Sequence, residues 1–119
     1  MLATERLLEI RERFGPHVER IVPLELDDEV LRLILYLPDG TNLRVTEDWR
    51  GEFLRRYSYY WLTSENELVI GWDNAPHHTH LETFPHHKHE GHRSNLLPSH
   101  DTCLEDVMDA ILPEVPATE

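Results

Sequence analysis

The chain has 119 residues, 29% of them charged and 39% hydrophobic, a size and composition that predict one soluble globular domain over residues 1–119. Its 23 acidic side chains outnumber the 11 basic ones, and the formal net charge of −12 argues against a protein that coats nucleic acid through a general positive field. No apolar run approaches the roughly 20 residues that cross a bilayer, and the single cysteine, Cys103, cannot form an internal disulfide. We therefore expect a cytoplasmic protein that does not contact a membrane.

The first predicted element is an amphipathic helix over residues 3–14. Its apolar residues recur near the 3.6-residue period, with charged residues between them. Thr4 is placed to cap the start of the helix, because its hydroxyl can accept a hydrogen bond from a free backbone N–H. Gly15-Pro16 ends the helix, since glycine tolerates the left-handed cap and proline cannot continue the helix.

Five strands are expected next, joined by short turns. Pro38-Asp39-Gly40 and the polar residues 64–66 are turn signals, so the strands on either side of them pair as antiparallel hairpins. Alternation in the fourth strand places Tyr57, Tyr59 and Trp61 on one face and the intervening residues on the other. The expected strand ranges are about 18–26, 30–37, 41–46, 53–63 and 68–72.

Residues 73–99 lack a clear hydrophobic period and are interrupted by prolines, although Thr83-Phe84 suits a short edge strand. The chain then enters a second helix over about residues 102–112, where Thr102 and Glu105 fit a capping box. Together the elements predict an α+β fold: an antiparallel meander sheet of about five strands with the N-terminal and C-terminal helices packed against it.

Histidine is concentrated between the last predicted strand and the second helix. Two phrases resemble each other, Ala75-Pro76-His77-His78 and Phe84-Pro85-His86-His87, and each proline restricts the residue before it. Because histidine serves as acid, base or metal ligand near neutral pH, the cluster has three interpretations: a solvated polar loop, a metal site, or a centre for acid–base catalysis. Seven of the nine histidines lie in this segment: His77, His78, His80, His86, His87, His89 and His92.

The metal interpretation rests on neutral imidazole as a ligand, with a divalent transition metal such as zinc, nickel or copper as the candidate cofactor. The pairs His77/His80 and His86/His89 have spacings that suit chelation on a turn, and Asp73 is a carboxylate that could complete a shell. No cysteine pair and no His-Glu-x-x-His helix accompanies them, so the sequence indicates no particular metal.

The catalytic interpretation follows from the needs of RNA cleavage, which are a base for the 2′-hydroxyl, an acid for the leaving oxygen and cations for the phosphate. The predicted catalytic residues are His77, His78, His86, His87 and Asp73. Asp73 would orient a histidine or pair with Arg55. Aromatic rings on the fourth strand could stack on bases, although rings that share a strand face are more often core. The predicted substrate-binding residues are Arg55, Arg56, Tyr57, Tyr59, Lys88 and His89.

Three phrases carry a resemblance to a known family: residues 56–61 (RYSYYW), 71–78 (GWDNAPHH) and 83–89 (TFPHHKH). They resemble the signature of TumE-like proteins, as does the Leu-Glu-Asp-Val ending at 104–107, and the match covers most of the chain from about residue 33 onward. The resemblance implies a prokaryotic toxin encoded beside a helix-turn-helix antitoxin. The chain departs from the pattern at Tyr60, where His is frequent, and at Trp72, where Tyr preceded by Arg is usual.

The predicted function is therefore that of a toxin-like component of a toxin–antitoxin pair, with the activity of a small ribonuclease, a hydrolase acting on RNA. The alternative is a non-enzymatic, histidine-rich module for metal binding or protein interaction. The expected partners are a helix-turn-helix antitoxin and RNA, and a homodimer is compatible with the sequence.

Overall fold

The computed structural model describes residues 1–115, and residues 116–119 of the expected domain lie outside the described part. Within residues 1–115, no helix is both long enough and apolar enough to cross a membrane. The elements in chain order are α1 (Ala3–Phe14), the 3-10 helix η1 (Gly15–His17), β1 (Arg20–Leu26), β2 (Val30–Tyr36), β3 (Asn42–Arg50), β4 (Phe53–Leu62), β5 (Leu68–Asp73), β6 (His87–Glu90), β7 (Leu96–Pro98), α2 (Leu104–Ile111) and the 3-10 helix η2 (Leu112–Glu114).

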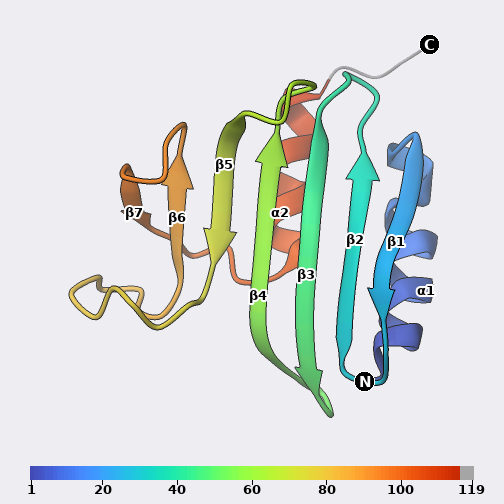
Figure 1. Cartoon of the computed structure of the whole chain (residues 1–119), viewed down its shortest axis with the longest axis horizontal. Helices are drawn as coiled ribbons and strands as arrows, with labels where there is room; N and C mark the ends of the chain where they lie inside the picture. The colour runs from blue at the N-terminus through green and yellow to red at the C-terminus, as the bar shows by residue number, and fades with distance from the viewer. Residues whose placement is uncertain (116–119) are drawn as a thin grey trace.

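The strands form one sheet in the order β1-β2-β3-β4-β5-β6-β7, and each strand is antiparallel to its neighbour in the chain (Figure 1). The predicted α+β fold with an antiparallel sheet is confirmed, but the prediction of about five strands is wrong, because the sheet has seven. The additional strands come from the segment without a hydrophobic period. β6 has the sequence His-Lys-His-Glu, and pairing with β5 and β7 holds it in the sheet in place of apolar alternation. Thr83 and Phe84, expected in an edge strand, lie in a turn.

One face of the sheet is covered, since both α-helices lie behind it in Figure 1. Ile10 of α1 and Met108 of α2 are fully buried, in the same hydrophobic core as Leu33, Tyr59 and Trp72 of the strands. Burying one large apolar side chain contributes roughly 1.5–3 kcal/mol, so this layer is a main source of stability. Figure 1 shows no helix in front of the opposite face, which we call the open face.

Helix α1 spans the predicted residues, but Thr4 does not cap it. The N-cap residue is Leu2, and no side chain caps the helix there. The backbone N–H of Ala3 instead donates to the carbonyl oxygen of Asp28 at 3.1 Å. The turn between β1 and β2 therefore satisfies one of the free backbone donors at the start of the helix.

Helix α2 begins one residue later than its capping box predicted. Cys103 is the N-cap residue, and the backbone N–H of Thr102 donates to Asp106 Oδ2 at 3.0 Å. Glu105 does not reach back to the cap, because its carboxylate binds Arg6 of α1 at 2.7 and 2.9 Å. A charged partner on the other helix thus replaces the predicted local hydrogen bond.

Arg6 is the centre of a buried charge cluster that links both helices to the sheet. Its side chain is 3% exposed, and its Nε donates to Glu47 Oε1 of β3 at 2.8 Å. Glu47 is fully buried and also accepts from Tyr59 Oη at 2.7 Å and Trp49 Nε1 at 2.9 Å. Burial alone would lower the pKa of Arg6, but the bonds to Glu105 and Glu47 raise it, so the guanidinium stays charged.

Candidate functional site

The strand register places the chemically active residues of β4, β5 and β6 beside one another on the open face. Ser58 lies opposite Asp73, and Asp73 lies opposite His87. Two residues further along the strands, and on the same face, Gly71 lies between Tyr60 and His89. Paired residues point to the same face of a sheet, and His87 and His89 are two apart, so both histidines share the face of Asp73.

The carboxylate of Asp73 is the meeting point of these side chains. Its Oδ1 lies 2.9 Å from Nε2 of His87 and accepts from the backbone N–H of Ala75 at 2.9 Å. Its Oδ2 accepts from Tyr60 Oη at 3.2 Å and lies 3.7 Å from Nε2 of His89. Asp73 and His87 are both buried, so water competes little for these contacts.

Backbone carbonyl groups fix the orientation of both imidazole rings. The carbonyl oxygen of Pro85 lies 3.1 Å from Nδ1 of His87, and that of Arg93 lies 2.7 Å from Nδ1 of His89. A carbonyl can only accept, so each Nδ1 carries a hydrogen. Each Nε2 is therefore the atom left to face the carboxylate of Asp73.

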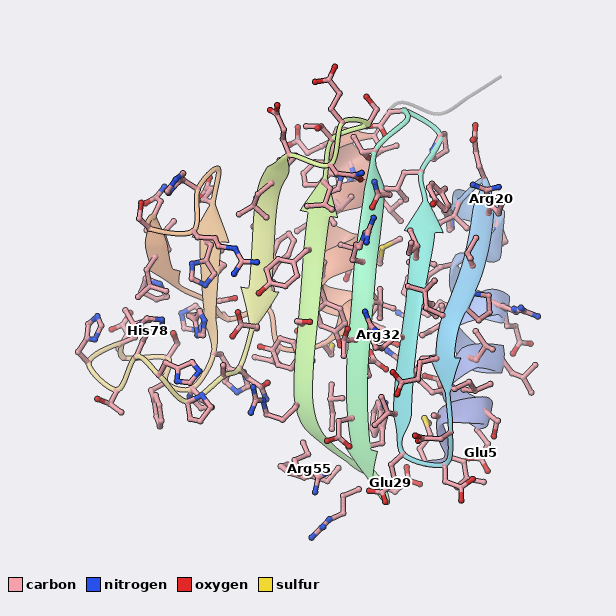
Figure 2. The ribbon with its side chains drawn as sticks, viewed as in Figure 1. Glu5, Arg20, Glu29, Arg32, Arg55 and His78 are labelled. Atoms are coloured by element: carbon pink, nitrogen blue, oxygen red, sulfur yellow. The ribbon has the colours of Figure 1, made fainter. Side chains whose placement is uncertain are left out.

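The two proline–histidine–histidine phrases converge at this place through His78 and His87. His78 projects from the loop between β5 and β6 (Figure 2), and its ring centroid lies 4.9 Å from that of His87 and 6.3 Å from that of His89. The rings of His77 and His80 lie 6.4 and 6.1 Å from that of His78. Lost hydration and then the neighbouring imidazoles lower the pKa of His78.

A groove with a volume of ≈ 450 Å³ opens above these residues. Tyr60 lines the groove, and its ring lies over Gly71, where a Cβ would come within 2.3 Å of Tyr60 Cδ1. The guanidinium carbon of Arg93 lies 5.8 Å from the centre of the Tyr60 ring. The groove is lined by Thr46, Asp48, Arg56, Tyr57, Ser58, Tyr60, Asp73, Ala75, His77, His78, His87, His89 and Arg93.

Several residues predicted for the site lie elsewhere. His86 faces away from Asp73, and its Nδ1 lies 2.8 Å from Tyr57 Oη, where burial and then the neighbouring His87 lower its pKa. Tyr59 is fully buried and bonded to Glu47, so it offers no surface for base stacking. Lys88 is paired with the buried Trp72 and shares its face of the sheet, opposite to the groove. His80 is absent from the groove lining.

The predicted pairing of Arg55 with Asp73 is wrong. Arg55 sits where the register of β4 shifts against β3, and its Nη2 donates to Asp48 Oδ2 at 2.7 Å. The bulge turns the arginine toward β3, while Asp73 on β5 bonds to Tyr60 and His87 instead.

Within residues 1–115, Asp73, His87 and His89 form a group that could hold a metal ion. Each offers one ligand atom, and these atoms all lie within 4.8 Å of one another. Of the residues predicted for a metal site, His89 and the carboxylate of Asp73 are in this group, whereas His86 is bonded to Tyr57 instead.

Six groove residues were not predicted for the site: Thr46, Asp48, Ser58, Tyr60, Ala75 and Arg93. Of these, Tyr60 brings an aromatic ring and Arg93 a cation to the groove. Tyr60 could have been found, because strand alternation had already separated it from Tyr57 and Tyr59, which form the core. Arg93 follows β6 in the hairpin to β7, and the sequence carries no apolar pattern that would reveal this hairpin.

The fold and the groove define an α+β protein with a carboxylate–histidine centre on the uncovered face of its sheet. Residues 4–117 match the family model described as Toxin TumE, so the chain belongs to this toxin family. Comparison with curated proteins and with solved structures gave no match. Membership supports a toxin-like role and implies an antitoxin partner.

Proposed function

We propose that this chain is a toxin that cleaves RNA in the groove of the open face. One observation supports the proposal above all: two histidine phrases from different parts of the chain meet beside one carboxylate, with the His78 and His87 rings 4.9 Å apart. Histidines can act as the base and the acid, and arginines as the cations, that phosphodiester cleavage requires.

The proposed roles follow from where each side chain lies. Both His77 and His78 line the groove. The half-buried His78 accepts the proton of the 2′-hydroxyl, while the exposed His77 donates a proton to the leaving 5′-oxygen. Arg56 and Arg93 line the groove and bind the phosphate. The half-buried Tyr60 ring supports a base by stacking.

The test compares two histidines of the same loop. We expect the His78→Ala variant of the tag-free protein to cleave a labelled single-stranded RNA at least ~100-fold more slowly than the wild type, as expected for loss of a general base. The control is His80→Ala, since His80 is on the same loop but outside the groove lining. Because its ring lies 6.1 Å from that of His78, we expect a small change in rate, at most about one tenth of the loss in His78→Ala. Circular dichroism and melting temperature verify that both variants are folded.

Two results would overturn the proposal. The first is that wild-type protein, freed from any partner, leaves single-stranded and structured RNA intact. The second is that His78→Ala and His80→Ala cleave at the same rate.

We further propose that the antitoxin is a helix-turn-helix protein that presents a basic surface to this chain. The family membership supports an antitoxin partner, and the net charge of −12 favours a partner of opposite charge. Co-expression with the product of the adjacent gene should yield a complex that weakens as salt concentration rises. Light scattering on the purified chain alone tests whether it forms a homodimer.

A further inference from the structure

We propose that Asp73, His87 and His89 bind one divalent transition-metal ion through a carboxylate oxygen and two Nε2 atoms. The ligand atoms come from neighbouring strands of a sheet, and Asp73 lies directly opposite His87 in the register. They already lie within 4.8 Å of one another, so an ion needs only a small closure of the group. The metal site lies in the groove of the proposed function. Metal binding itself is independent of that function, and only a role of the ion in RNA cleavage rests on it.

The hydrogen bonds around the group are those that metal-binding histidines and carboxylates make. Metal-ligating histidine usually donates its second ring N–H to a backbone carbonyl or a carboxylate. His87 and His89 both do so, toward Pro85 and Arg93, at 3.1 and 2.7 Å. The carboxylate is oriented in turn by the N–H of Ala75 and the hydroxyl of Tyr60.

The positions of the imidazole N–H hydrogens explain why a cation suits this site. With each Nδ1 hydrogen committed to a carbonyl, each Nε2 offers a lone pair toward the negative Asp73. The two ring centroids lie 5.1 Å apart, and the three ligand atoms all lie within 4.8 Å of one another. One divalent ion accepts both lone pairs and balances the carboxylate at the same time.

The ligand set also indicates the kind of ion. Imidazole nitrogen suits zinc, nickel, copper and iron, whereas magnesium and calcium prefer oxygen ligands. Three protein ligands leave a coordination position open, as in catalytic zinc sites. Because all three ligands line the groove, this position faces the groove that also contains His78. A bound ion would there supply positive charge for a phosphate oxygen of the substrate.

The closing experiment measures metal binding by the full-length, tag-free, chelator-treated protein. Titration calorimetry with zinc sulfate should give one tight site per chain, and cobalt(II) should give a visible absorption band that zinc displaces. We expect His89→Ala and Asp73→Asn to weaken zinc binding at least ~10-fold. His87 is buried, so its removal could unfold the protein. We therefore test His87→Gln, and its zinc affinity is interpreted only if its circular dichroism spectrum matches that of the wild type.

The matched controls are His80→Ala and His92→Ala, exposed histidines of the same segment outside the group. Unchanged zinc affinity in these controls, with loss in His89→Ala and Asp73→Asn, supports the site. If zinc affinity falls equally in all variants, or if His89→Ala binds zinc as tightly as the wild type, the proposed site is wrong. Zinc would then be bound by histidines spread over the segment.

A separate assay of RNA cleavage, with and without added zinc, distinguishes the two proposals. Tight zinc binding without any cleavage refutes the proposed function and leaves the metal site. Cleavage by a protein that binds no zinc refutes the metal site and leaves the proposed function.

Discussion

The two faces of the sheet each carry a cluster of ionisable side chains, and the clusters are built differently. On the covered face, Arg6 binds Glu47 and Glu105, so its charge meets opposite charge on two sides. On the open face, two imidazoles of β6 share the single carboxylate of Asp73. In the first cluster, every charged group has a partner of opposite charge within the protein. In the second, the Nε2 lone pairs of the two histidines suit a cation.

This difference teaches which cluster holds the fold together and which one is available for chemistry. A buried ion pair contributes little beyond a well-packed apolar substitute, but removing one of its partners is costly. A groove whose polar atoms face an opening can exchange its partners with solvent, ion or substrate. Changes on the covered face should therefore alter stability, and changes on the open face should alter binding.

The largest effect is expected from Glu47→Ala on the covered face. The change removes the acceptor of the buried Tyr59 hydroxyl and the Trp49 indole and deprives Arg6 of a partner. We expect the free energy of unfolding to fall by about 3–5 kcal/mol, measured by urea denaturation. Glu12→Ala, an exposed position on α1, is the control and should change it by at most about 0.5 kcal/mol. A loss below about 1 kcal/mol in Glu47→Ala would contradict a structural role for the cluster.

The next effect is on the open face, where Tyr60→Phe removes the hydroxyl that donates to Asp73. Because outer-shell partners orient metal ligands, we expect zinc affinity to fall about 10-fold in calorimetry. Gly71→Ala should have a similar effect by a different route, since its Cβ displaces the Tyr60 ring. Wild-type affinity in both variants would show that the tyrosine does not support the site.

A smaller effect is expected from Tyr57→Phe, the same chemical change on the covered face. The hydroxyl of Tyr57 bonds to Nδ1 of His86 at 2.8 Å, and its loss should lower the free energy of unfolding by about 1 kcal/mol. Tyr57 also lines the groove, but its hydroxyl bonds to His86 and not to Asp73, so zinc affinity should be unchanged. If Tyr57→Phe weakens zinc binding as much as Tyr60→Phe, the separation of the two faces is wrong.

The smallest effect concerns pH and Glu105. Burial alone would raise the pKa of Glu105, but the hydrogen bonds and charge of Arg6 outweigh it and lower the pKa below the usual 4.5. A lowered folded-state pKa stabilises the protein above 4.5, and this contribution is lost as the pH falls through the folded-state value. The stability difference between wild type and Glu105→Gln, about 1 kcal/mol or less, should therefore shrink when urea denaturation is repeated below pH 4.5. A difference independent of pH would contradict the assignment.

Much of the covered face could be predicted from the sequence, because its elements carry strong hydrophobic periods. The helix over residues 3–14 and the strand at 53–62 begin where predicted, and the alternation of Tyr57, Tyr59 and Trp61 marks them as core. The strands beyond β5 depend instead on pairing between strands. β6 is polar and becomes a strand through its pairing with β5 and β7, which no local pattern reveals.

The site was predicted in its composition but not in its geometry. Clustered histidines and Asp73 were identified from the sequence, yet the sequence could not assign adjacent histidines to opposite faces of a strand that had not been recognised. In the structure, His87 contacts Asp73, whereas the adjacent His86 bonds to Tyr57. Of the two aromatic residues predicted for the site, Tyr57 lines the groove and Tyr59 is buried in the core. Tyr60, from the other face of the same strand, also lines the groove and was not predicted.

The meander topology has a further consequence for how such a protein can diversify. Because every strand pairs with its sequence neighbour, Tyr60, Asp73, His78, His89 and Arg93 fall on one uninterrupted stretch of chain. If that stretch alone were exchanged between two members of the family, nearly all the named side chains of the groove would be transferred with it. Both helices and β1, β2 and β3 would be inherited intact from the recipient.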